Sequence, residues 1–253
     1  MATSFRKSEI LDLARKDGRV EVDDLAERFG VAVQTIRRDL SALASEGKLS
    51  RVHGGAIFPT GVENIQYEVR RRLEADAKAA IGRAIAAEIA PNTALFLNIG
   101  TTTEAVARAL TGHENITVIT NNIHVATILA ANPSCEIILT GGTLRRSDGG
   151  LVGEVAIEAV RQFKLDTAII GCSAIDADGD LLDFDLQEVR VSKAILGQAR
   201  RKILAADASK FQRSAPARIA GLEALDLVVT DRMPDALRNR CAASGTEVRT
   251  VQV

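Results

Sequence analysis

Apolar residues in the first part of the chain recur at the three- and four-residue spacing of helices. A first helix is predicted over 4–16, where a glycine follows the end of the pattern. A second, short helix is predicted over 25–29, because Asp23 and Asp24 offer an N-cap and an acidic first turn. A tight turn at 30–32 leads into a third helical segment, so the pattern predicts three short helices in succession.

The third helical segment, 33–45, has two contrasting faces. Ile36, Leu40 and Leu43 fall on one side at helical spacing, so this side is predicted to face a core. The polar side carries amide, hydroxyl and guanidinium groups, contributed by Gln34, Thr35, Arg37, Arg38 and Ser41. Such groups suit base edges and phosphates in the major groove of DNA. A solvated helix face is the alternative, but two adjacent arginines beside glutamine and threonine favour DNA contact.

A short β-hairpin is predicted over 47–57, where two glycines separate two brief strands. Its basic residues Lys48, Arg51 and His53 form a second candidate DNA-contacting edge. Three helices followed by a hairpin predict a winged helix-turn-helix domain over residues 1–57. The polar, charged segment 58–76 is predicted to be a linker that leads into a helix, and the second domain is assigned to 77–253.

The remaining residues alternate brief apolar runs with helical segments. The predicted strands are 94–98, 116–119, 136–139, 165–170, 203–206, 227–229 and 248–251. The predicted helices lie near 77–89, 103–111, 123–131, 154–162, 187–199 and 234–244. This alternation is typical of a mostly parallel sheet with helices on both faces, so the chain is assigned to the α/β class, with a Rossmann-like domain after the winged helix-turn-helix.

Composition and charge narrow the function classes. The 253 residues are 46% hydrophobic and 26% charged, which is typical of folded globular domains. The net charge is −1, so any contact with nucleic acid must come from a local basic patch. Aromatic residues make up only 3% of the chain and tryptophan is absent, which disfavours a single-strand binder that stacks bases on aromatic rings.

Membrane, metal and catalytic roles find little support in the sequence. No apolar stretch approaches the roughly 18 residues that span a bilayer, and the first residues lack the apolar core of a signal peptide, so a cytoplasmic protein without a membrane partner is expected. Three cysteines and three histidines are scattered along the chain, which favours reduced core thiols over disulfides or a metal site. No spacing places a catalytic triad or an acid and base pair, and no cofactor is expected.

A candidate anion site lies where the strand predicted at 94–98 gives way to a helix. Gly100 permits a sharp turn, the amides of a helix start point towards an anion, and the hydroxyls of Thr101 and Thr102 add donors next to Asn98. The carboxyl end of a strand in a parallel sheet is also where ligands usually bind. A strand-to-helix turn capped by threonine is the alternative, and these residues alone do not decide between the two.

Polar residues after the other strands are expected to join this site in one cleft. They are Asn121, Gly141, Gly142, Asp176, Glu188 and Lys210. Lys210 suits a phosphate as a point charge; an exposed lysine behind an N-capping Asp207 is the alternative. The acidic spacing over 176–180 departs from that of an EF-hand loop, so a turn with solvated acids is favoured over a calcium site.

Several of these segments resemble the DeoR family of bacterial repressors. The resemblance rests on 35–40, 51–56, 98–102, 120–122, 141–142, 207–211 and 230–231, so it covers essentially the whole chain. It implies a transcriptional repressor whose second domain is similar to sugar-phosphate isomerases and binds a phosphorylated metabolite. Segments 104–107, 146–150 and 175–185 most resemble a member that responds to glycerol 3-phosphate, which is therefore the expected effector.

Carried over by position, the resemblance assigns functions to particular residues. It implies DNA reading by Gln34, Thr35, Arg37 and Arg38, phosphate binding by Gly100, Thr101, Thr102 and Lys210, and polar cleft positions at Asn121, Asp176 and Glu188. Ala32 stands where the family usually has a serine, and the missing N-cap oxygen is expected to cost about 1 kcal/mol. The implied partners are double-stranded operator DNA and a phosphorylated small molecule, with a homodimer or homotetramer as the assembly. The alternative function is a sugar-phosphate isomerase or deaminase with an added N-terminal domain.

Overall fold

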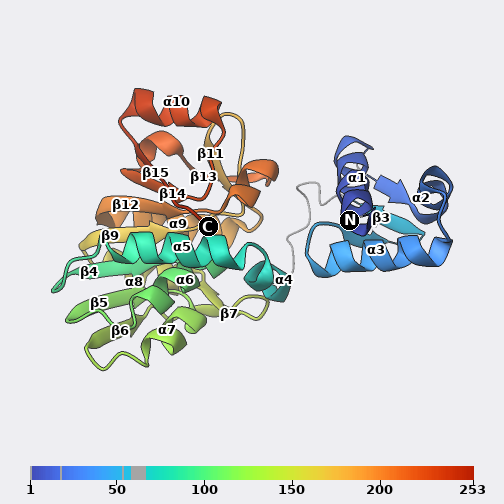
Figure 1. Ribbon diagram of the computed structural model, residues 1–253. Coiled ribbons are helices and arrows are strands. Elements are labelled where there is room, and N and C mark those ends of the chain that lie inside the picture. Colours follow the sequence, from blue (N-terminus) through green and yellow to red (C-terminus); the bar gives the residue numbers. More distant parts are fainter. Residues whose placement is uncertain (1, 18, 53, 58–66) are drawn as a thin grey trace. The chain divides into compact units, whose positions relative to one another are not determined.

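The computed structural model describes residues 2–17, 19–52, 54–57 and 67–253, and the chain folds into two units that divide in sequence between Leu73 and Glu74 (Figure 1). This division falls within the predicted linker, whose residues 58–66 lie outside the described residues. His53 of the predicted hairpin also lies outside them.

The N-terminal unit has the three predicted helices and the predicted hairpin. Its elements are α1 (Ala2–Asp17), β1 (Arg19–Glu21), α2 (Val22–Phe29), α3 (Val33–Ser45), β2 (Ser50–Val52), β3 (Gly55–Ile57) and α4 (Tyr67–Arg72). Ile36, Leu40 and Leu43 of α3 are almost wholly buried in its core, which confirms the predicted apolar face. Strand β1, too short for the sequence pattern to assign, adds to the hairpin as the outer strand of an antiparallel sheet ordered β1-β3-β2.

The turn before α3 is built as the sequence predicts. Gly30 ends α2 in the left-handed conformation, with φ of 61°, which glycine adopts without strain. Ala32 is the N-cap residue of α3 and provides no side-chain acceptor, so the first turn of α3 lacks the usual cap.

The C-terminal unit is built on a seven-stranded sheet in which every pairing is parallel. Its strands are ordered β15-β14-β12-β9-β4-β5-β6 and span β4 (Ala94–Leu97), β5 (Ile116–Thr120), β6 (Cys135–Leu139), β9 (Leu165–Ile170), β12 (Ala199–Ala205), β14 (Leu227–Thr230) and β15 (Glu247–Thr250). The α/β class and the parallel sheet are thereby confirmed.

Helices cover both faces of this sheet (Figure 1). One face carries α5 (Ala75–Ala86), α6 (Thr101–Ala109) and α7 (Ile123–Leu129), and the other carries α8 (Glu154–Arg161), α9 (Leu186–Gln198) and α10 (Asp235–Ser244). Successive strand residues point to opposite faces, so Leu95 and Leu97 join one core while Phe96 joins the other.

Several short elements that pack around the sheet were not predicted. They are the hairpin β7 (Thr143–Arg145) and β8 (Gly150–Val152), the antiparallel strands β10 (Ala174–Ile175), β11 (Asp180–Asp183) and β13 (Ala217–Gly221), and the 3₁₀ turns η1 (Ala208–Gln212) and η2 (Leu222–Ala224). Strand β12 also begins four residues earlier than predicted, because its polar amino end pairs with β9 from Ala199 onward.

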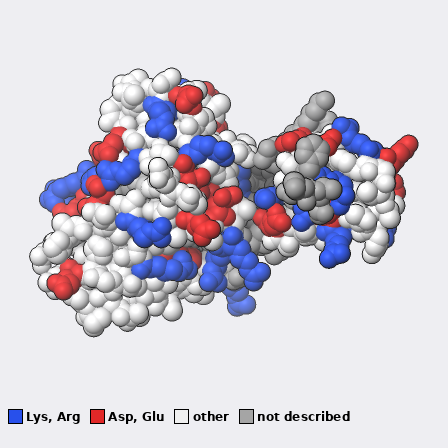
Figure 2. Space-filling model, in the orientation of Figure 1, with Lys and Arg blue, Asp and Glu red and all other residues white. Residues whose placement is uncertain are grey.

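Charge on the C-terminal unit is mixed. On the face shown in Figure 2, lysine and arginine side chains are interspersed with aspartate and glutamate, in keeping with the net charge of −1. Among the described residues, no helix combines the length and apolar character needed to cross a membrane.

Candidate functional site

The polar face predicted for the third helix is exposed on α3. Gln34, Arg37, Arg38 and Ser41 are exposed, and Thr35 is partly buried at the first turn. The opposite face of α3 is fixed in the core, so these side chains are presented together on a rigid helix. The structure therefore has the exposed polar face that the sequence predicts.

The basic hairpin residues have partners within the N-terminal unit. Arg51 Nη1 donates to the backbone oxygen of Arg37, 3.1 Å away, and to Ser41 Oγ at 3.4 Å, so β2 is braced against α3. Lys48 Nζ pairs with Glu46 Oε2 at 2.9 Å. Both side chains stay exposed. Arg51 lies beside the polar face of α3, and Lys48 lies beside the end of this helix.

An ion pair that the sequence analysis missed holds α1 to α3. Arg6 Nε lies 2.6 Å from Asp39 Oδ2, and the Asp39 side chain is only 5% exposed. Although Asp39 directly follows the exposed Arg37 and Arg38 on α3, its buried carboxylate fixes the helix and does not join the polar face.

The strand order creates a crevice in the C-terminal unit. Strand β4 is first in sequence but lies inside the sheet, with β5 and β6 on one side and β9, β12, β14 and β15 on the other. The connections from β4 and β9 therefore leave in opposite directions, and such a switch point is where open α/β sheets bind ligands. The two carboxyl ends come close: a Cβ at Gly171 would lie 3.5 Å from the backbone oxygen of Ile99.

The predicted anion loop lies at this switch point. Gly100 starts α6 with φ of 145°, and the side chains of Thr101 and Thr102 are buried. Asn98 braces the loop, because its Nδ2 donates to Ser192 Oγ of α9 at 2.8 Å and its Oδ1 accepts from the Ile99 amide at 2.7 Å. The first amides of a helix have no acceptor within the helix, so the start of α6 favours an anion.

Two buried lysines face this edge from elements far apart in sequence. Lys78 on α5 is 4% exposed and Lys210 on η1 is 7% exposed. Burial raises the pKa of Asp207, but the charges of Lys210 and Lys78 and hydrogen bonds from Ser209 hold it below its ordinary value. The carboxylate at the end of β12 therefore lies within electrostatic reach of both ammonium groups, and the three form a cationic pole with a net charge of about +1.

Helix α5 is oriented so that Lys78 lies at the carboxyl edge. Glu88, just past the end of α5, pairs with Arg201 at the amino end of β12 at 2.8 Å, so the start of α5 lies at the other edge. A Cβ at Gly82 would lie 2.6 Å from the backbone oxygen of Ala105, so α5 and α6 are in close contact. Lys78 is one turn before Gly82, and the start of α6 is one turn before Ala105, which places Lys78 level with the anion loop.

The other side of the crevice is rich in carboxylates gathered around Arg145. Its guanidinium contacts Asp148 Oδ2 at 2.7 Å, Asp185 Oδ2 at 2.8 Å and Glu188 Oε2. Burial and the like charge of Asp183 raise the pKa of Glu188 to about 8, against the opposing effect of Arg145. Burial also favours a higher pKa for Asp185, but hydrogen bonds from Arg145 and the Gln187 amide hold it below its ordinary value.

Cys172 lies between the two groups. Burial raises the pKa of its thiol to about 12, with the charge of Lys210 acting to lower it and those of Asp183 and Asp207 acting to raise it. Charges from the cationic pole and from the carboxylate-rich side therefore both act on this thiol.

The structure brings most of the predicted site residues together, with exceptions. Asn121 is fully buried at the end of β5, next to the end of β4. Asp176 lies instead in the β10–β11 turn, where its Oδ1 accepts from the amides of Asp178 and Asp180, so the predicted turn is confirmed and the carboxylate is used within it.

One of the two predicted glycines, Gly142, has a packing role. Both Gly141 and Gly142 have positive φ, 72° and 110°. A Cβ at Gly142 would lie 2.7 Å from the backbone oxygen of Val152, so this glycine permits close contact between the chain after β6 and the end of β8.

Lys78 is the main residue that sequence reasoning missed. It stands on the buried face of α5 with Ala77, Ile81 and Ile85, where a lysine is unexpected without a specific partner. A single lysine on an otherwise apolar helical face was the available signal.

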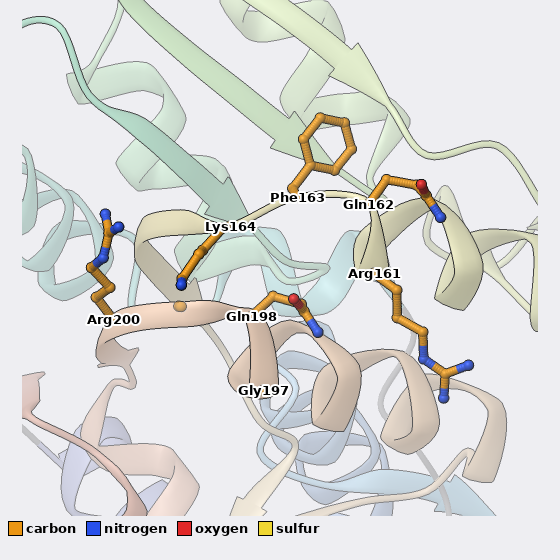
Figure 3. A pocket seen from close by; sticks show the side chains of 8 residues that line it. Arg161, Gln162, Phe163, Lys164, Gly197, Gln198 and Arg200 are labelled. Atoms are coloured by element: carbon orange, nitrogen blue, oxygen red, sulfur yellow. The ribbon is translucent and has the colours of Figure 1, made fainter.

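A cavity of about 420 Å³ lies at the opposite, amino-terminal edge of the sheet, between the α8–β9 and α9–β12 connections (Figure 3). The side chains of Arg161, Phe163 and Arg200 point away from one another there (Figure 3). Arg161 pairs with Glu158, and Arg200 pairs with Asp166 at 2.9 Å, so carboxylates already neutralise these two cations. The cavity therefore lacks the converging polar groups of the carboxyl edge.

Both units match known families. The DeoR-like helix-turn-helix domain matches residues 6–62, and the DeoR C terminal sensor domain matches residues 73–232. The Glycerol-3-phosphate regulon repressor of Escherichia coli (strain K12) is 42% identical over 234 residues, which cover 92% of this chain and 93% of the relative. The HTH-type transcriptional repressor CsqR of the same organism is 37% identical over 244 residues, 96% of this chain and 94% of the relative.

Among solved structures, ribose 5 phosphate isomerase A from Neisseria gonorrhoeae is similar, with a TM-score of 0.38 and 13% identity over 56% of this chain and 54% of that chain.

A helix-turn-helix unit joined to a sensor domain defines a transcriptional regulator. The chain belongs to the DeoR family of transcriptional repressors. Because the similar proteins are repressors, the alternative of an isomerase or deaminase with an added domain is set aside.

Proposed function

We propose that this repressor controls a carbon-catabolism operon and is released from its operator by a phosphorylated polyol, glycerol 3-phosphate. The observation that carries the proposal is the pair of buried lysines, Lys78 and Lys210, beside the helix start at Gly100. A doubly charged phosphate suits this pole, since it can replace Asp207 as the partner of both lysines. The name of the E. coli relative, a glycerol-3-phosphate regulon repressor, supports the choice of polyol.

In the C-terminal unit, the residues of the candidate site divide between the phosphate and the carbon chain of the effector. Amides and hydroxyls of Gly100, Thr101 and Thr102 bind the phosphate oxygens with the two lysines. Asn98, Asn121 and Glu188 line the space for the effector's carbon chain on the side of β5 and α9. Gly141 and Gly142 let the polypeptide after β6 pass close to β8.

On the DNA side, α3 enters the major groove. Gln34, Thr35, Arg37, Arg38 and Ser41 contact base edges and phosphates, and the hairpin residues Lys48, Arg51 and His53 contact the flanking backbone. One winged helix buries too little surface for operator-level specificity, so at least a homodimer binds the operator.

The test uses the full chain and a DNA duplex that the parent protein selects from a random-sequence library. Fluorescence anisotropy follows release of this duplex during titration with glycerol 3-phosphate, ribose 5-phosphate, fructose 6-phosphate and inorganic phosphate. We expect glycerol 3-phosphate to release the duplex at the lowest concentration. Release by none of these compounds would contradict the proposal.

Two lysine variants make the test specific to the site. We expect Lys210→Ala and Lys78→Met to bind the duplex like the parent and to need at least tenfold more glycerol 3-phosphate for release, since a lost charge-assisted hydrogen bond costs about 1.5–3 kcal/mol. Lys193→Ala, which changes an exposed lysine on α9, is the charge-matched control and should behave like the parent. Unchanged release from both site variants would show that the phosphate binds elsewhere.

A further inference from the structure

The β7–β8 hairpin closes over the end of β5. It leaves the sheet after β6 and returns so that the Leu151 amide donates to the backbone oxygen of Asn121 at 2.7 Å, while Asn121 Nδ2 donates to the backbone oxygen of Leu151 at 3.2 Å. The Ile123 amide donates to the backbone oxygen of Gly149 at 3.0 Å. Asn121 and its neighbour Asn122 are fully buried beneath this return strand.

Each of these two asparagines leaves one amide atom unpaired among the described residues. Asn121 Oδ1 and Asn122 Nδ2 are buried without a hydrogen-bond partner. The opposite end of each amide is paired, Asn121 Nδ2 with Leu151 and Asn122 Oδ1 with the His124 amide at 2.9 Å. These pairings fix which end of each side chain is oxygen and which is nitrogen, so the unpaired atoms are one acceptor and one donor.

An unpaired buried donor or acceptor costs about 1–3 kcal/mol, so two in adjacent residues need an explanation. An acceptor beside a donor complements hydroxyl groups, which both donate and accept. A carboxylate, a carbonyl or an ammonium group would satisfy only one of the two atoms. The pair therefore fits neighbouring hydroxyl groups, which can satisfy both atoms.

The pair lies within reach of the anion loop. Leu97 of β4 is the register partner of Thr120 of β5, so the next residues, Asn98 and Asn121, are neighbours across strands roughly 5 Å apart. A Cβ at Gly150 of the hairpin would lie 2.4 Å from Ile99 Cδ1, so the hairpin also contacts the end of β4. The asparagines and the anion loop therefore lie at neighbouring strand ends.

We propose that Asn121 and Asn122 form a hydroxyl-recognising subsite of the effector site, so that tight binding requires free hydroxyls on adjacent carbons of the phosphorylated compound. The inference rests on the proposed function, to which it adds the two residues that recognise the hydroxyls. One hydroxyl donates to Asn121 Oδ1, and its neighbour accepts from Asn122 Nδ2. Because both atoms are covered, the hairpin must lift for the polyol to enter.

The first arm of the test varies the ligand and leaves the chain unchanged. Calorimetry on the full-length parent compares glycerol 3-phosphate with n-propyl phosphate, which has the same phosphate and carbon count but no hydroxyls, and with inorganic phosphate. We expect glycerol 3-phosphate to bind at least tenfold more tightly than n-propyl phosphate. Equal affinity for these two compounds would overturn the subsite.

The second arm inverts one atom of the pair. Asn122→Asp keeps the oxygen that caps α7 through the His124 amide and replaces the unpaired donor with an acceptor. We expect this variant to bind glycerol 3-phosphate at least tenfold more weakly than the parent and n-propyl phosphate within about threefold of the parent. Asn92→Asp, which adds the same charge at an exposed position before β4, should match the parent for both compounds.

The outcomes separate the two proposals. An Asn122→Asp protein that keeps the parent's preference for glycerol 3-phosphate over n-propyl phosphate overturns the subsite and leaves the proposed function standing. A parent that binds none of the three compounds overturns the proposed function instead. If Asn122→Asp does not fold, the ligand comparison on the parent decides the question alone.

Discussion

Arg37 and Arg38 are exposed side by side on α3, while Ile36, the residue directly before them, is fully buried. Since the core fixes the helix, truncating either arginine should remove a proposed DNA contact without disturbing the fold. We predict that Arg37→Ala and Arg38→Ala each weaken binding to the selected duplex by at least tenfold at fixed salt, since a good base contact contributes about 1–3 kcal/mol. A gel-shift titration measures the loss.

The control for this prediction is calorimetry with glycerol 3-phosphate, which should give parental affinity for both arginine variants. Parental DNA affinity in both would remove α3 from the interface. Arg28→Ala, at an exposed position on α2, serves as a matched charge change that should leave DNA affinity within a few-fold of the parent.

Glu188 carries a pH dependence whose sign follows from its surroundings. Burial and Asp183 raise its pKa to about 8 from an ordinary value of 4.5, so the folded chain holds this proton more tightly than the unfolded chain. The associated stability is fully present below about pH 4.5 and is lost as the pH rises through 8. We predict that the melting temperature of the parent falls between pH 5.5 and pH 8.5 more steeply than that of Glu188→Gln.

Thermal unfolding of both proteins across this range isolates the contribution of Glu188, because all other titrations are shared. Parallel curves would mean that Arg145 keeps Glu188 ionised throughout. Glutamine still offers Arg145 an acceptor, so the variant tests charge and not the loss of a contact.

Residues that obey a positional rule were predictable, and residues that depend on tertiary partners were not. Gly100, Thr101 and Thr102 follow a strand and start a helix, which suffices to nominate them. Lys78 was overlooked because its neighbours along α5 are mostly apolar and Asp207, whose pKa its charge helps to lower, is more than 120 positions away. Asp176 matched the family motif, yet its carboxylate closes its own turn.

At the scale of elements, the close contact between α5 and α6 depends on one glycine. A Cβ at Gly82 would meet the Ala105 backbone oxygen at 2.6 Å and the Val106 nitrogen at 3.0 Å. We predict that Gly82→Ala lowers the free energy of unfolding of the C-terminal unit by about 1–3 kcal/mol, as overpacking does. Because the shift separates Lys78 from the anion loop, glycerol 3-phosphate should also bind more weakly.

Gly197 near the end of α9 is the matched control. A Cβ there meets nothing within 4 Å, so Gly197→Ala should stabilise the chain by about 0.5–1 kcal/mol through the better helix propensity of alanine. Urea denaturation measures both changes. Equal effects from the two substitutions would show that α5 and α6 adjust without cost.

Elements long enough to show a period were predicted within a few residues, as for β9 at 165–170 and α7 from Ile123. The antiparallel strands β10, β11 and β13 were not predicted, because each has only two to five residues and β11 pairs with β13 across 34 to 41 positions of sequence. These short strands and the β7–β8 hairpin lie around the candidate site. The sequence therefore predicted the parallel sheet and its helices better than the short elements that surround this site.

At the scale of the whole molecule, the proposed operator recognition calls for more than one copy of the chain. A single winged helix contacts one half-site, and a two-fold assembly doubles the contact and matches a palindromic operator. We predict that the full-length protein sediments as a dimer or larger species at micromolar concentration, both alone and with the selected duplex. Sedimentation as a monomer under both conditions would contradict this.

Release by an effector also fixes how tightly the effector binds the DNA-bound protein. If glycerol 3-phosphate lowers operator affinity by a given factor, the operator must lower affinity for glycerol 3-phosphate by the same factor, typically 5- to 150-fold. We predict that the two factors are equal within error. Calorimetry gives the affinity for glycerol 3-phosphate of the free protein and of the protein saturated with duplex, and anisotropy gives the affinity for the duplex with and without saturating ligand.

Lys78→Met tests where the coupling starts, because Lys78 lies on α5, the helix that begins directly after the division between the units. A variant that binds the ligand weakly yet shows the parent's full coupling at saturation would place Lys78 in binding alone. Reduced coupling at saturation would place it on the path from the phosphate to the DNA-binding unit.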